Sequence, residues 1–278
     1  MRSCPHEAMS SRGEPARWTT TTPAGELSIA DWPGADPVVL ALHGRAGHGR
    51  EWDRLAAALV DRRILAADLR GHGESNWTSD YLIESMVDDV LHCLDATGAG
   101  RVDVVGHSLG GLIAMVLAAR EPERVRRLVV ADIGPVLPRG AAAALNDPPP
   151  DDFASPQDAV VHLRSQHPVA PDDVLARRVE HGLVPAPNDR WRWRHDPALD
   201  HLTSDPTFTR LWDHWDAIEV PVLIVRGGQS AILSADLAAE MAERGFACEL
   251  SVVPRAGHDV HTDLPERFGD LVQSFLHR

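Results

Sequence analysis

A serine enclosed by glycines stands between an apolar run and a helical segment. Residues 106–111 read Gly-His-Ser-Leu-Gly-Gly, after the apolar run 102–105 and before a helix-like stretch that ends at Arg120. Glycines two residues to either side of a serine, at a strand-to-helix hinge, form a turn that exposes the hydroxyl over a helix N-terminus. Such a turn leaves no room for side chains and strains the serine backbone. Ser108 is therefore the candidate nucleophile.

Composition limits the partners of this chain. Its 278 residues suffice for one large domain with an insertion, and a net charge of −14 disfavours a nucleic-acid partner. No apolar stretch reaches the roughly 18 residues of a membrane span. Cys4, Cys93 and Cys248 are scattered, which argues against a disulfide framework or a thiolate zinc site. We expect a cytoplasmic protein with no membrane partner, whose oligomeric state stays open.

Short β-rich runs alternate with helical segments along most of the chain. This order predicts a mostly parallel sheet covered by helices on both faces. The expected strands are 18–22, 27–31, 37–42, 64–67, 102–105, 127–131, 222–226 and 249–253. The expected helices are 52–59, 81–97, 112–120, 234–244 and 264–276. Residues 1–15 are expected to be a disordered tail, and 16–134 with 217–278 to form the core.

The pattern changes between residues 135 and 216. Prolines cluster at 148–150, the helices are short, and four tryptophans gather at positions 191, 193, 212 and 215. We expect this segment to be a helical cap over the carboxyl edge of the sheet, where ligands of open α/β sheets bind. Trp191 and Trp212 are candidate substrate-binding residues, although core packing is the better expectation for any single tryptophan.

Four ordered blocks resemble those of the α/β-hydrolase superfamily. They are Leu-His-Gly-Arg-Ala-Gly at 42–47, Asp-Leu-Arg-Gly-His-Gly at 68–73, the turn around Ser108, and Gly257-His258. Within the superfamily the chain is similar to small capped serine esterases with an Asp-Ile-x-Pro stretch, here residues 132–135. The resemblance implies a mostly parallel eight-stranded sheet flanked by helices, with a helical cap inserted after the sixth strand. It implies no metal and no organic cofactor.

A serine hydroxyl needs a base at neutral pH, and His258 is the candidate. An imidazole accepts the hydroxyl proton and later donates it to the leaving group. His258 follows the last expected strand, where the resemblance places the catalytic histidine. His261, three residues further on, is expected to be a bystander.

The acid that should orient the histidine is missing from its usual place. The loop after the seventh strand, 226–233, has no carboxylate, and similar proteins often have Asp where this chain has Ala231. The resemblance offers Asp132 as the alternative acid. Asp132 could instead cap the start of the insertion. Asp236 is a weaker option, and Asp68 resembles a structural aspartate of the fold.

Acyl transfer also needs hydrogen-bond donors for the developing oxyanion. The resemblance implies the backbone N–H groups of Arg45 and Leu109. The Arg45 side chain could pair with a substrate carboxylate, or fold back onto Glu51 or Asp53. His107 is expected to pack beside the nucleophile or to line the pocket.

These residues together predict an enzyme acting on a small ester-like molecule. The expected reaction is cleavage of a carboxylic ester, thioester or lactone through an acyl-enzyme on Ser108. One alternative is a carbon–carbon hydrolase, lyase or cyclase of natural-product metabolism in the same pocket. Another is a ligand-binding protein that has lost turnover.

Overall fold

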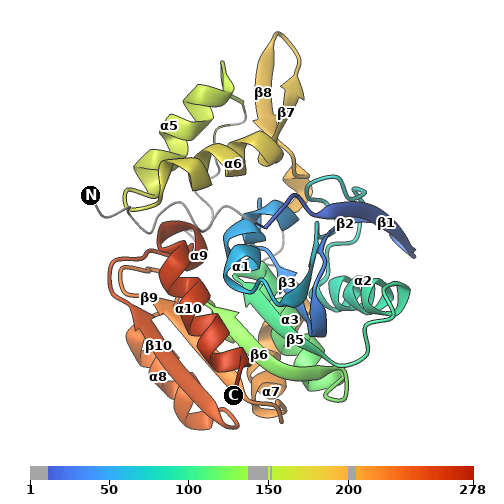
Figure 1. The fold of residues 1–278 in the computed structure, drawn as a ribbon, viewed down its shortest axis with the longest axis vertical. Helices are drawn as coiled ribbons and strands as arrows, with labels where there is room; N and C mark the ends of the chain where they lie inside the picture. The colour runs from blue at the N-terminus through green and yellow to red at the C-terminus, as the bar shows by residue number, and fades with distance from the viewer. Residues whose placement is uncertain (1–11, 137–149, 151, 200–204) are drawn as a thin grey trace.

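A single eight-stranded sheet runs through the molecule. The structure is a computed structural model that describes residues 12–136, 150, 152–199 and 205–278. The strand order is β1-β2-β4-β3-β5-β6-β9-β10 (Figure 1). β2 pairs antiparallel with β1 and β4, and all other pairs are parallel. The strands are β1 (Ala16–Thr22), β2 (Gly25–Trp32), β3 (Ala35–Leu42), β4 (Arg62–Ala67), β5 (Val102–His107), β6 (Val125–Ala131), β9 (Val222–Gly227) and β10 (Cys248–Val253). The predicted mostly parallel, eight-stranded sheet is confirmed.

Helices cover both faces because each face of the sheet is apolar. One core cluster contains buried side chains of α2, α3, α7 and α8, and a second contains those of α1 and α10. In α2, Met86, Val90 and Leu94 are buried at the spacing of four that the sequence shows. The helices of this core are α1 (Asp53–Ala58), α2 (Ile83–Ala96), α3 (Leu109–Arg120), α7 (Leu211–Asp216), α8 (Ala235–Arg244), α9 (Val260–Asp263) and α10 (Pro265–Leu276), with short 3-10 turns η2 (Gly49–Trp52) and η4 (Pro206–Thr209).

The segment between β6 and β9 contributes a separate layer, which we call the insertion (residues 150 and 152–199). It contains α5 (Pro156–Gln166), α6 (Asp172–Gly182) and a hairpin of β7 (Leu183–Ala186) with β8 (Arg190–Trp193). These elements share their own apolar core, which includes Phe153, Leu175 and Trp193. Figure 1 shows them as one group outside the sheet and its flanking helices. The hairpin is an addition to the expected all-helical cap.

The insertion ends earlier in the structure than the sequence pattern predicts. Residues up to 216 are expected to belong to the cap, yet α7 packs against α3. Leu211 and Trp215 of α7 are buried in the core cluster of that face. Apolar burial on α3 therefore places α7 in the core. The proline cluster at 148–150 lies mostly outside the described residues.

The described end of the predicted N-terminal tail is anchored. Residues 1–11 lie outside the described part, but the Arg12 guanidinium donates hydrogen bonds to the carbonyls of Ala56 and Leu59 at 2.8 and 2.6 Å. Glu14 forms an ion pair with Arg177 at 2.9 Å. The expectation of a disordered tail therefore does not hold for residues 12–15. Among the described residues, no helix is long and apolar enough to cross a bilayer.

Candidate active site

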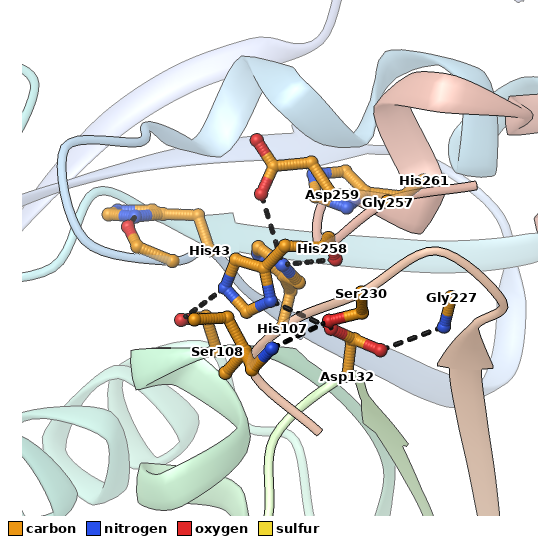
Figure 2. Close-up of polar contacts among 12 residues, drawn as sticks. His43, His107, Ser108, Asp132, Gly227, Ser230, Gly257, His258, Asp259 and His261 are labelled. Atoms are coloured by element: carbon orange, nitrogen blue, oxygen red, sulfur yellow. Dashed lines mark hydrogen bonds and ion pairs between the residues drawn. The ribbon is translucent and has the colours of Figure 1, made fainter. Parts of the chain in front are cut away.

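Three side chains from three loops meet at the carboxyl edge of the sheet. Ser108 follows β5, Asp132 follows β6, and His258 lies after β10. His258 Nε2 is 3.0 Å from Ser108 Oγ, and His258 Nδ1 is 2.8 Å from Asp132 Oδ2. Figure 2 shows the imidazole between the hydroxyl and the carboxylate. This is the nucleophile, base and orienting acid arrangement of acyl-transfer sites.

Backbone strain and close packing fix the turn that presents the Ser108 hydroxyl to His258. Ser108 has φ 50° and ψ −117°, a conformation that non-glycine residues rarely adopt. A Cβ at Gly106 would lie 2.3 Å from the Gly110 carbonyl oxygen, and one at Gly110 would lie 2.2 Å from that of Leu42. Both contacts are far below van der Waals distance, so these positions require glycine. The structure thus has the sharp, strained turn at Ser108 that the sequence predicts.

The Asp132 carboxylate is held by the last residue of β9 and by the loop that follows it. Its Oδ1 accepts a 2.7 Å hydrogen bond from the backbone N–H of Gly227, and its Oδ2 accepts one from Ser230 Oγ. Asp132 itself is fully buried and has φ 51°. The loop without a carboxylate therefore supplies two donors that fix a carboxylate from the neighbouring strand (Figure 2). The sequence reading missed Ser230, although a hydroxyl in a loop that lacks the expected acid was the available signal.

The electrostatic surroundings of His258 favour its protonated form. Burial lowers the pKa of His258, but the hydrogen bond to Asp132 and the charge of Asp259 outweigh this effect and raise the pKa above its usual value. We assign the proton of the neutral ring to Nδ1, since its partner Asp132 is an acceptor. Nε2 then faces Ser108 with a free lone pair, as a general base requires.

The predicted oxyanion donors are the backbone N–H groups of Leu109, which follows Ser108 in the sequence, and of Arg45, which follows Gly44. Leu109 is the first residue of α3, where backbone N–H groups have no acceptor within the helix. Gly44 packs against Ser108, since a Cβ at Gly44 would lie 3.2 Å from Ser108 Cβ. Its neighbour Arg45 is half-buried at this position.

Two other histidines border the site, as packing groups. His107 is buried, and its Nε2 lies 3.1 Å from the carbonyl oxygen of His258 and 3.3 Å from Asp259 Oδ1. Burial and then the proximity of His261 hold the pKa of His107 well below its usual value. His261 stacks on Trp52 with ring centroids 4.8 Å apart. The contacts of His107 place it against the loop that carries His258.

The two candidate tryptophans have different positions. Trp191 lies in β8, pairs through its backbone with Phe153, and packs on the core of the insertion. Trp212 lies on α7, where the Arg244 guanidinium is 3.8 Å from its ring centroid. Arg244 ends α8, just before the amino end of β10, whereas Ser108 lies at the carboxyl edge. The prediction that Trp212 binds substrate is therefore corrected: its ring packs at the opposite edge of the sheet.

The remaining sequence candidates also have defined places. Asp68 is buried and accepts hydrogen bonds from the backbone N–H groups of Gly49 and Glu74 at 2.7 and 2.9 Å, which is the expected structural role. Asp236 is exposed in the first turn of α8. The carboxylate of Glu51 pairs with Arg178, and that of Asp53 with Arg50 and Arg177. Glu51 and Asp53, the acids considered as fold-back partners of Arg45, thus also contact other arginines.

A metal has only one candidate location among the described residues. His107, His258 and Asp259 have ligand atoms within 4.8 Å of one another. Both nitrogens of His258 already face Ser108 and Asp132, and Asp259 pairs with Arg178 at 2.7 Å. We therefore assign no metal to this group.

The sheet order, the strained serine turn and the Ser-His-Asp contacts define a hydrolase of the α/β type. The family profile described as "alpha/beta hydrolase fold" matches residues 37–197, which is more than half of the chain. The protein belongs to this family. It is an α/β hydrolase enzyme.

Similar proteins are named as an esterase, a lipase and a hydrolase. The chain is 31% identical over 266 residues to the esterase Rv0045c of Mycobacterium tuberculosis, covering 91% of this chain and 87% of that protein. It is 30% identical over 260 residues to the sn-1-specific diacylglycerol lipase ABHD11 of Mus musculus, covering 90% and 84%, respectively. The solved structure of E-2-(acetamidomethylene)succinate hydrolase has a TM-score of 0.85 at 27% identity, covering 95% of this chain and all of that one. These similarities support an ester-cleaving activity.

Proposed function

We propose that this protein is a serine hydrolase that cleaves a small carboxylic ester, thioester or lactone through an acyl-enzyme on Ser108. The observation that carries the proposal is the continuous set of contacts from Ser108 Oγ through His258 to Asp132 Oδ2, with lengths of 3.0 and 2.8 Å. A base at hydrogen-bond distance from a hydroxyl, itself oriented by a buried acid, is what nucleophilic catalysis by serine requires.

The chemistry divides into two halves. Ser108 Oγ attacks the substrate carbonyl carbon while His258 Nε2 takes the hydroxyl proton, and the carbonyl oxygen becomes an oxyanion facing the N–H groups of Arg45 and Leu109. Collapse breaks the bond to the leaving group, which receives the proton from His258. Water then attacks the acyl-enzyme with His258 again as base, and the carboxylic acid leaves as Ser108 regains its proton.

We propose that the insertion acts as the cap of this site. It is joined to the core by ion pairs such as Arg178 to Glu51, at 2.9 Å, and Arg177 to Asp53, at 2.7 Å. A docked cap excludes water from the reacting groups and determines which acyl chains fit. Trp191 of β8 is proposed as part of the inner wall of the cap.

We propose that Arg45 contributes to binding of substrates that carry a carboxylate. Its neighbour Gly44 packs against Ser108, so the backbone of Arg45 belongs to the loop beside the proposed nucleophile. Arginine binds carboxylates through two parallel hydrogen bonds. The structurally similar E-2-(acetamidomethylene)succinate hydrolase is named for a succinate derivative, which is an acid of this kind. We therefore propose acidic acyl compounds as the preferred substrate class.

Arg45→Leu is expected to reduce the preference for acidic over neutral esters about 10- to 100-fold, because one charge-assisted contact contributes roughly 1.5–3 kcal/mol. The measurement is the ratio of kcat/KM for a hemisuccinate ester and for a neutral ester of the same length. Arg101→Leu is the matched control, since Arg101 is exposed and contacts the Val125 carbonyl near the amino end of β5. An unchanged ratio in Arg45→Leu would remove the carboxylate contact from the proposal.

The proposed nucleophile is tested directly with a fluorophosphonate probe. An activated serine displaces fluoride and forms a stable phosphonyl ester, whereas an ordinary serine hydroxyl does not react. We expect one adduct per chain, located at Ser108 by mass spectrometry of the peptides. An unmodified protein, or an adduct at another residue, would contradict the serine hydrolase proposal and favour a ligand-binding role.

A further inference from the structure

A buried cluster of charges joins the insertion to the loop that carries His258. Arg178 of α6 contacts Glu51 Oε1 through Nε at 2.9 Å and Asp259 Oδ2 through Nη1 at 2.7 Å. The exposed fractions of the side chains are 15% for Arg178, 3% for Glu51 and 13% for Asp259. Asp259 directly follows His258, and Glu51 lies in η2, beyond the loop of Arg45. One guanidinium of the insertion thus contacts segments on both sides of the site.

A second contact fixes the same loop from its other end. His167, at the end of α5, places Nδ1 2.9 Å from Asp263 Oδ1, and Asp263 Oδ2 accepts a 2.6 Å hydrogen bond from the backbone N–H of Gly257. The residues on both flanks of His258 are therefore tied to the insertion, through Asp263 on one side and Asp259 on the other. His107 Nε2 also lies 3.1 Å from the carbonyl oxygen of His258.

The charges in this cluster act strongly on one another because they are shielded from water. Burial alone would raise the pKa of Asp259, but the Arg178 guanidinium holds it well below its usual range. The same guanidinium outweighs burial and lowers the pKa of Glu51. Both acids are thus ionised at neutral pH. Removal of either charge from such a pair leaves the other uncompensated.

We propose that Arg178 is a positioning residue for His258: it holds Asp259 in place, and with it the loop that presents the imidazole to Ser108. The insertion then does more than cover the site, since its docked position keeps the base at 3.0 Å from the nucleophile. The inference rests on the proposed role of His258 as general base. No residue of the proposed triad needs to change in order to test it.

The groups that face His258 determine what the test should show. They are Ser108 and His107 at the end of β5, Asp132 at the end of β6, Arg178 on α6, and Asp259 on the loop itself. Asp259 and Asp132 raise the pKa of His258, and Arg178 lowers it. Loss of the Asp259 charge should therefore lower the His258 pKa, and loss of the Arg178 charge should raise it.

The experiment measures kcat/KM against pH with a neutral ester. The base must be unprotonated, so activity falls as pH drops through the His258 pKa, and the wild-type midpoint is expected above the ordinary value of about 6.5. Asp259→Asn should move this midpoint down by about 0.5–1 pH unit, and Arg178→Met should move it up by a similar amount. Both variants should also lose roughly tenfold in kcat, with less change in KM.

Arg177→Met is the matched control, because Arg177 is also on α6 and pairs with the core through Asp53 without touching Asp259. Its midpoint should equal that of the wild type. Midpoints of Asp259→Asn and Arg178→Met that stay at the wild-type value, or move in the same direction, would overturn the inference. If Arg178→Met does not fold, the downward shift in Asp259→Asn decides.

A fluorophosphonate control keeps this inference separate from the proposed function. If the wild type labels at Ser108 but the pH midpoints of the variants do not move, only the positioning role of Arg178 is contradicted. If the wild type does not label, the proposed function fails, and nuclear magnetic resonance titration of the His258 ring still tests the two opposite shifts. Absence of those shifts would then overturn the positioning role as well.

Discussion

Ser108→Ala is expected to reduce kcat for short p-nitrophenyl esters by about 10⁵- to 10⁶-fold, the loss typical of a removed serine nucleophile. Ser108 Oγ is the hydroxyl that His258 Nε2 contacts in the described part of the chain, at 3.0 Å, and the ring is fixed through Nδ1. The loss should appear in kcat, since the variant retains the pocket. Steady-state kinetics at saturating ester measures it.

The fold of this variant should be unchanged. The Ser108 backbone is held by its N–H, which donates to the Ala131 carbonyl at 3.2 Å, and by the flanking glycines. Thermal unfolding should therefore give a midpoint close to that of the wild type. Ser165→Ala, at an exposed serine of α5, is the matched control and should retain full activity. Ester hydrolysis that persists in Ser108→Ala would exclude the acyl-enzyme mechanism.

The strands of the core were predictable because the apolar runs in the sequence coincide with the strands of the sheet. Apolar runs bounded by turn residues predict each strand, and the observed ends lie within two residues of the expected ones. The serine turn follows from Gly106 and Gly110, whose Cβ positions are occupied by backbone atoms. Strands of a parallel sheet present their carboxyl ends at one edge, so residues after β5, β6 and β10 come together.

The parts that were not predictable depend on contacts between distant segments. The sequence signal for Ser230 is weak, a hydroxyl in a loop without the expected acid, because its partner Asp132 is 98 residues away. Arg178 reads as one of several charged residues on α6, and only docking of the insertion brings it to Glu51 and Asp259. Trp212 was placed near the substrate by composition, but α7 packs on α3. Sequence spacing carries no information on how an insertion docks.

Asp132→Asn is expected to reduce kcat by about 10⁴-fold while the fold persists. The hydrogen-bond partners at this position determine the orientation of the introduced amide. The backbone N–H of Gly227 donates to Oδ1 at 2.7 Å, so the amide oxygen must occupy that side. The amide NH₂ then faces His258 Nδ1, which becomes an acceptor, and the ring proton moves to Nε2. A protonated Nε2 cannot accept the hydroxyl proton of Ser108.

The measurement compares Asp132→Asn with Asp236→Asn, since Asp236 was the weaker candidate for the same role and is exposed on α8. Asp236→Asn should keep the wild-type kcat. The fluorophosphonate reaction of Asp132→Asn should slow in parallel with kcat, because both steps require deprotonation of Ser108. A near-normal kcat in Asp132→Asn would show that another group orients His258. Within the described structure Asp132 is the carboxylate in contact with His258 Nδ1, at 2.8 Å, so the expected loss follows from its position.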